Sequence, residues 1–182
     1  MSNIVVQKIA ITGTPGTGKT SVGFELISRG HRVIDLNSFA KENGLLQDWD
    51  GDLQTFEVDI SKLENEVSKL KVDQGSIFYE GHLSHFLSVD VIIVLRCNPC
   101  IIKQRLEERG YVADKVLENL EAEALDVILV ESMDSGAPVY ELDCSLLTIA
   151  EIANGIEEII TGTSNKYLPG NIDWSEGLLK WC

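Results

Sequence analysis

Short runs of Ile and Val alternate along the chain with longer segments in which apolar residues recur at helical spacing. The short runs predict buried β-strands at residues 4–12, 32–36, 76–80, 89–95 and 139–142. The run at 89–95 is apolar throughout, as is typical of a central strand in a parallel sheet. Strands separated by helical segments predict βαβ units and therefore an α/β fold.

The helical patterns lie between these strands and after the last one. Helices are predicted at residues 20–29, 37–42, 61–71, 99–109, 113–133 and 148–160. Ser61 and Glu64 have the spacing of a capping box, which would begin the third of these helices. Residues 44–59 are polar and are expected to form an exposed insert, and the residues after Gly162 form a tail without a predicted element.

The turn after the first strand carries the pattern G-x-x-x-x-G-K-[ST], at Gly13, Gly18, Lys19 and Thr20. Its glycines let the backbone direct N–H groups at phosphate oxygens, and the next helix adds its positive N-terminal end. Lys19 is expected to reach the β- and γ-phosphates of ATP, and the Thr20 hydroxyl to bind Mg²⁺. The pattern stands between a predicted strand and a predicted helix, which favours a phosphate-binding P-loop over a glycine turn without a ligand. The expected fold is therefore a three-layer α/β/α P-loop NTPase domain around a five-stranded parallel sheet.

A second acidic centre is predicted at the end of the third strand. P-loop proteins use a carboxylate near another strand end to hold Mg²⁺ or its waters, and Glu80 is the candidate metal residue beside Thr20. His82 follows on the loop, at the edge where parallel sheets bind their ligands. The alternative is a solvated strand end with surface histidines, and a zinc site from His82, His85 and cysteines lacks the usual ligand spacing.

Three of the five arginines fall in one window, at Arg96, Arg105 and Arg109. Arg105 and Arg109 are four residues apart and so share one face of the predicted helix at 99–109. With Gly110 as a hinge, they predict a lid that closes over ATP and brings guanidinium groups to the transferred phosphate. The alternative is surface pairing with the glutamates nearby.

Composition limits the classes of partner. The chain has 182 residues, of which 15 are basic and 29 acidic, for a net charge of −14. Such a surface repels nucleic acid and anionic membranes, so direct nucleic-acid binding is not expected. The longest apolar run is too short to span a bilayer, and four cysteines without a signal-peptide pattern predict a reduced, cytoplasmic protein. Cys97 and Cys100 spell C-x-x-C, a weak redox or metal signal without a second pair.

Taken together, these motifs resemble those of the atypical adenylate kinases, the isoenzyme six family, and in particular its archaeal branch. The resemblance covers about residues 4–160 and is carried by residues 12–20, 80–82, 94–96, 105–111 and 115–131. It implies a nucleotide kinase domain at 1–162, with a monophosphate-binding region near 35–59 and a lid near 108–118. The tail at 163–182 lies outside it.

The resemblance also implies roles for single residues. ATP would be held by Gly13, Gly16, Gly18, Lys19, Thr20, Ser21 and Arg109. The catalytic residues would be Lys19, Arg105, Arg109 and His82, and AMP would be bound by Asp35 and Lys41. Two positions depart from the family, because Glu80 stands where an aspartate is common and Lys41 where an arginine is often found. Lysine offers the AMP phosphate a point charge in place of a bidentate fork.

Three functions remain open from the sequence. The resemblance implies transfer of the ATP γ-phosphate to AMP, giving two ADP, with ATP hydrolysis and a part in maturation of the small ribosomal subunit. The alternative is an ATP-switched assembly factor that binds a small-subunit ribosomal protein and has little kinase activity. A kinase for a small metabolite, such as shikimate or dephospho-coenzyme A, is the third, although residues 44–59 show no pattern for those acceptors.

Overall fold

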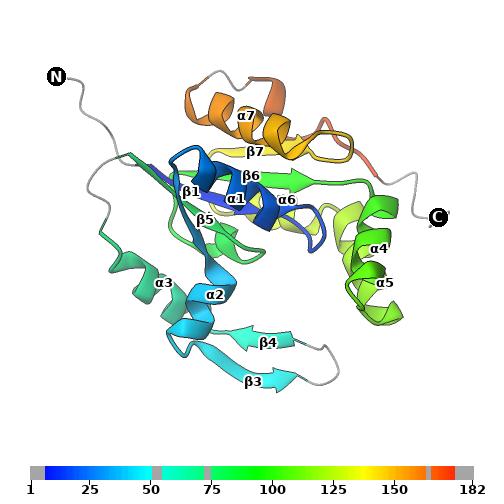
Figure 1. Cartoon of the computed structure of the whole chain (residues 1–182), viewed down its shortest axis with the longest axis horizontal. Coiled ribbons are helices and arrows are strands. Elements are labelled where there is room, and N and C mark those ends of the chain that lie inside the picture. The colour runs from blue at the N-terminus through cyan, green and yellow to red at the C-terminus, as the bar shows by residue number, and fades with distance from the viewer. Residues whose placement is uncertain (1–6, 51–54, 72–74, 163–164, 175–182) are drawn as a thin grey trace.

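Five parallel strands form a central sheet in the order β2-β5-β1-β6-β7 (Figure 1). The computed structural model describes residues 7–50, 55–71, 75–162 and 165–174. The strands are β1 (Gln7–Thr12), β2 (Arg32–Asp35), β5 (Ser76–Glu80), β6 (Val91–Arg96) and β7 (Val139–Asp143). The predicted five-stranded parallel sheet is confirmed, while residues 4–6 of the predicted first strand lie outside the described residues.

Helices cover both faces of this sheet. They are α1 (Lys19–Ser28), α2 (Leu36–Glu42), α3 (Ile60–Ser68), α4 (Pro99–Glu108), α5 (Ala113–Ala124), α6 (Val127–Met133) and α7 (Ile149–Ile160), with short 3₁₀ turns η1 (Ser84–Phe86) and η2 (Asn165–Tyr167). Side chains of successive strand residues point to opposite faces. Ile9 and Ile11 of β1 therefore pack with α1 and α7, and Ala10 packs with Leu129 of α6. Helices α2 and α3 share a second cluster with Tyr79 of β5, which completes the three layers.

The third helix begins differently from its predicted start. Asp59 is the N-cap of α3, and its Oδ1 accepts the Lys62 backbone N–H at 3.1 Å. The capping box predicted at Ser61 and Glu64 is therefore wrong, because a carboxylate two residues earlier already satisfies the first turn. A capping box does occur at α7, where Thr148 and Glu151 bond each other reciprocally.

The single helix predicted at 113–133 is two helices, α5 and α6, separated at Asp126. Asp126 adopts a left-handed conformation with φ 56°, a conformation that Asp tolerates better than most residues. The guanidinium of Arg96 on β6 donates to the Glu123 carbonyl at 3.0 Å and to the Asp126 carboxylate. In a continuous helix the Glu123 carbonyl would accept the N–H of residue 127. It accepts from Arg96 instead, and α5 ends at Ala124.

The predicted polar insert contains a two-stranded antiparallel hairpin. Strands β3 (Leu46–Asp50) and β4 (Thr55–Val58) pair with each other and extend away from the central sheet at the bottom of Figure 1. Residues 51–54 of the insert, and residues 163–164 and 175–182 of the predicted tail, lie outside the described residues. Across the part of the chain that the structure describes, no helix has the length and apolar character needed to cross a membrane.

Candidate active site

The glycine-rich loop joins β1 to α1 and depends on its glycines. Gly13, Gly16 and Gly18 have φ values of 140°, 97° and 104°, which side chains rarely adopt. A Cβ on Gly13 would lie 2.3 Å from the Leu95 carbonyl oxygen, so this position has no space for a side chain. The loop delivers the chain into α1, whose first residue is Lys19, and the helix N-terminus is therefore open towards the loop.

Lys19 lies inside this loop. Its Nζ donates to the carbonyl oxygens of Gly13 and Thr14 at 2.7 and 3.1 Å, and the residue is only 8% exposed. Burial lowers the pKa of Lys19 to about 8, although the carboxylates of Glu80 and Glu123 act in the opposite direction. The ammonium group is thus a poorly hydrated cation held by two neutral carbonyls, and a phosphate would be a stronger partner for it.

Glu80 lies across from Lys19 at the end of β5. Its carboxylate is 3% exposed, and Thr20 Oγ1 donates to its Oε1 over 3.5 Å. Burial raises the pKa of Glu80, and the charge of Lys19 opposes that change. His82 follows on the same loop, and burial lowers its pKa to about 4, with a smaller contribution from Lys19. His82 is therefore neutral at pH 7.

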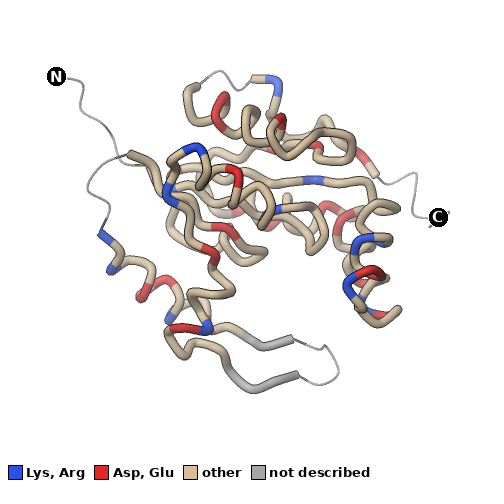
Figure 2. The backbone as a smooth tube through the Cα atoms, in the orientation of Figure 1, with Lys and Arg blue, Asp and Glu red and all other residues tan. Residues whose placement is uncertain are grey.

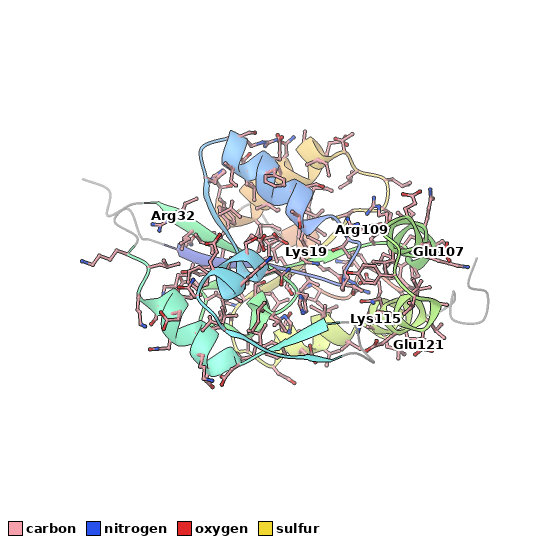
Figure 3. All side chains as sticks on the ribbon, turned by 60° about the horizontal axis from the view of Figure 1, so that its bottom comes forward. Lys19, Arg32, Glu107, Arg109, Lys115 and Glu121 are labelled. Atoms are coloured by element: carbon pink, nitrogen blue, oxygen red, sulfur yellow. The ribbon has the colours of Figure 1, made fainter. Side chains whose placement is uncertain are left out.

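The two lid arginines have different positions. Arg109 lines the cavity above the P-loop, whereas Arg105 lies behind the loop, where its Nη1 donates to the Gly16 carbonyl at 2.8 Å. Arg105 therefore holds the loop from outside the cavity. Arg109 and Lys115 line the cavity together with Lys19, whereas Glu107 and Glu121, also labelled in Figure 3, are not part of its lining. Arg96, the third arginine of the window, is a core residue, 1% exposed, in an ion pair with buried Glu123.

A cavity of about 470 Å³ brings these groups together. It is lined by Thr14, Pro15, Gly16, Gly18, Lys19, Thr20, Ser21, Asn37, Glu80, His82, Arg109, Tyr111, Lys115, Asn119, Ala122 and Ile128. The P-loop, the second acidic motif and the end of α4 therefore meet as the sequence predicts. Asn37, Lys115 and Asn119 were missed. For the last two, the available signal was their four-residue spacing within the helix predicted at 113–133.

The two residues predicted to bind AMP lie apart from this lining. Asp35 caps α2, where its Oδ1 accepts the Asn37 N–H at 2.9 Å and its Oδ2 accepts the Ser38 hydroxyl at 2.7 Å. Lys41 is exposed in the last turn of α2. Their part in AMP binding stays a prediction.

Two cysteines, Cys97 and Cys144, are buried. Cys97 and Cys144 are free thiols, and burial raises the pKa of Cys97 to about 11. A thiol with a raised pKa is a poor nucleophile and a poor redox group at neutral pH. Across residues 7–50, 55–71, 75–162 and 165–174, no three His, Cys, Asp or Glu side chains are placed to hold a metal ion by themselves.

The sequence matches a known family and named archaeal relatives. A family model described as an AAA domain matches residues 9–126. A protein of Archaeoglobus fulgidus named "Putative adenylate kinase" is 43% identical over 170 residues, which are 91% of this chain and 90% of the relative. One of the same name from Methanocaldococcus jannaschii is 44% identical over 172 residues, 93% of this chain and 94% of the relative.

Solved structures show the same fold at low sequence identity. A shikimate kinase from Acinetobacter baumannii has a TM-score of 0.63 at 14% identity, covering 89% of this chain and 97% of its own. A deoxyadenosine kinase from M. mycoides has a TM-score of 0.54 at 16% identity, covering 85% and 100%. The chain therefore belongs to the AAA-domain family of P-loop proteins, together with the archaeal relatives that carry the adenylate kinase name.

Proposed function

We propose that this chain is an adenylate kinase that transfers the γ-phosphate of ATP to AMP and yields two ADP. One observation carries the proposal: Lys19 of the P-loop faces Glu80, His82 and Arg109 across a single cavity. A site with a phosphate loop on one side and an arginine on the other suits a phosphoryl group that passes from a donor to an acceptor. The archaeal relatives' name supports AMP as the acceptor.

Each residue has a task in this proposal. Loop N–H groups and Lys19 bind the β- and γ-phosphates, and Arg109 neutralises charge on the transferred group from the lid side. Lys115 and Asn119 extend the lid side of the same cavity. His82 acts as a neutral hydrogen-bonding group and not as a general acid, because its lowered pKa leaves the imidazole uncharged near pH 7. Asp35 and Lys41 remain the proposed AMP contacts, reached when the α2 region closes.

Thr20 and Glu80 fit Mg²⁺. They offer a hydroxyl and a carboxylate, the oxygen ligands that Mg²⁺ prefers. Glu80 is buried, and its hydrogen bond from Thr20 is long, at 3.5 Å. A buried carboxylate that is weakly paired favours a cation beside it. Bound Mg²⁺ supplies positive charge to the β- and γ-phosphate oxygens.

The proposal is tested by following ADP formation from Mg-ATP with AMP, with no acceptor, with shikimate and with dephospho-coenzyme A. AMP is expected to accelerate ADP formation well above the rate with water alone. If AMP gives no acceleration while another acceptor does, the adenylate kinase assignment is wrong. The likeness to shikimate kinase does not choose the acceptor, because it shows the fold alone.

We also propose a second function, an ATPase of the isoenzyme six type that acts in the cytoplasm on small-subunit maturation. The net charge of −14 supports a basic protein partner such as a ribosomal protein. Among the described residues, acidic positions occur on α3, α5 and α7 (Figure 2). A pull-down with the tagged protein and ATP is expected to recover a small-subunit ribosomal protein, and recovery of none would remove this second function.

A further inference from the structure

A buried carboxylate joins the P-loop to helix α5, which begins within the lid predicted near residues 108–118. Glu123, in the last turn of α5, is 2% exposed. Its Oε2 accepts the Thr14 hydroxyl at 2.6 Å, and its Oε1 accepts the Arg96 Nε–H at 2.8 Å and the Cys97 backbone N–H at 3.0 Å. Both carboxylate oxygens are therefore engaged, one by the loop and one by the end of β6.

Thr14 connects this carboxylate to Lys19. The residue belongs to the P-loop and lines the phosphate cavity, yet it is 1% exposed because its hydroxyl is directed to Glu123. The Thr14 carbonyl accepts from Lys19 Nζ at 3.1 Å and from the Thr17 hydroxyl at 3.0 Å. The hydrogen bond that orients the Thr14 side chain therefore also positions the Thr14 carbonyl, which accepts from the Lys19 ammonium.

Arg96 supports Glu123 and extends the network to the tail. Its Nη1 donates to Glu141 Oε2 at 3.2 Å, and Glu141 is 2% exposed. The other oxygen of Glu141 accepts the backbone N–H groups of Gly170, Asn171 and Ile172 at 2.9, 2.8 and 3.1 Å. Hydrogen bonds thus run without a break from Thr14 to the segment after α7. Charged, buried and fully bonded networks of this kind hold their members in one arrangement.

We propose that Glu123 is a positioning residue for phosphate binding, which fixes the P-loop through Thr14 and ties it to helix α5. Helix α5 also carries Lys115 and Asn119 of the cavity lining. Glu123 therefore sets the distance between these lid residues and the P-loop on the opposite wall. The expected effect on turnover rests on the proposed function. The expected effect on ATP binding does not, because ATP binding can be measured without a phosphate acceptor.

The test compares two substitutions of Thr14 in the full chain. Thr14→Val keeps the shape and removes the hydroxyl, whereas Thr14→Ser keeps the hydroxyl. The lost hydrogen bond has a charged acceptor, so Thr14→Val is expected to raise the Kd for Mg-ATP by about tenfold in calorimetric titrations, while Thr14→Ser stays within about twofold of wild type. A wild-type Kd for Thr14→Val, or an equal loss in Thr14→Ser, would overturn the proposal.

Ser132→Ala is the matched control. The Ser132 hydroxyl is also buried and donates to the Ile128 carbonyl at 2.6 Å within α6. Ile128 is part of the cavity lining, whereas Ser132 itself is not. It is expected to leave the Kd for ATP unchanged even where it lowers the melting temperature. If Ser132→Ala weakens ATP binding as much as Thr14→Val, the effect of Thr14 is general destabilisation and the proposal fails.

Steady-state kinetics separate this inference from the proposed function. In Thr14→Val the KM for ATP is expected to rise about tenfold and the KM for AMP to stay near wild type. If wild-type protein binds ATP but AMP does not accelerate turnover, the adenylate kinase proposal fails and the binding comparison still decides the role of Glu123. Should Thr14→Val not fold, Glu123→Gln serves instead, because the amide keeps the shape and changes one acceptor oxygen to a donor. It is expected to weaken ATP binding severalfold, and unchanged binding would overturn the proposal.

Discussion

Replacement of Lys19 by Met is expected to stabilise the protein while abolishing ATP binding. The ammonium of Lys19 is buried against the P-loop, and its pKa falls from the ordinary 10.5 to about 8. That difference corresponds to about 3 kcal/mol by which the fold disfavours the charged form. Methionine keeps the apolar stem and carries no charge, so this cost is absent from the variant.

The lost hydrogen bonds reduce the gain. The Thr14 carbonyl keeps the Thr17 N–H and hydroxyl as donors, at 3.2 and 3.0 Å, whereas the Gly13 carbonyl loses the Lys19 donor. One such loss costs about 1 kcal/mol. The free energy of unfolding at pH 7 should therefore rise by about 2 kcal/mol in Lys19→Met, and Tm by about 4–8 °C for a domain of this size.

The pH dependence gives the sharper test. A lysine whose pKa is lower in the folded than in the unfolded protein destabilises the fold fully below about pH 8, and this destabilisation disappears as the pH rises to 10.5. The stability difference between Lys19→Met and wild type should thus be largest at pH 7 and shrink by pH 10, in urea unfolding at each pH. Lys62→Met is the control, because its parent side chain is 66% exposed, and its stability should change by less than about 0.5 kcal/mol. A Lys19→Met protein that is less stable than wild type at pH 7, or a difference that does not change with pH, would refute the reasoning.

Three further predictions follow from the same geometry. Because only the protonated Lys19 attracts phosphate, the affinity for ATP should fall as the pH rises through about 8, and a Kd that stays constant from pH 7 to about 9.5 contradicts this. Arg105→Gln should mainly raise the Kd for ATP, by about tenfold, since Arg105 holds the Gly16 carbonyl. Arg109→Gln should mainly lower kcat, because Arg109 lines the cavity. If each variant changed Kd and kcat equally, the different roles given to the two arginines would be wrong. Burial lowers the pKa of His82 to about 4, so the pH profile of kcat/KM should have the same shape near pH 6.5 in wild type and in His82→Gln. An ionisation near pH 6.5 that is present in wild type and absent from His82→Gln would contradict this.

The sequence by itself determined the fold class and the centre of the site. Alternation of β-rich and helical runs is a local property, and it predicted all five strands of the central sheet. The P-loop could also be predicted, because the backbone of the loop requires glycines at positive φ and Lys19 and Thr20 follow them at a fixed spacing. Glu80 and His82 line the same cavity as the P-loop, a position that the sequence predicts because strand ends in a parallel sheet share one edge.

Only the tertiary structure decided what crosses between elements. Arg96 looked like a member of the arginine cluster, and its neighbours in space made it a core ion pair with Glu123 and Glu141. The same guanidinium binds Asp126 between α5 and α6, and helical periodicity cannot detect this break because the partner lies 30 residues away. Arg105 and Arg109 share a spacing, yet one supports the P-loop from behind and the other faces the cavity. Pairing between buried charges depends on which side chains meet in the fold. An unpaired buried charge is costly because it has lost its hydration, so its partner can come from any part of the chain.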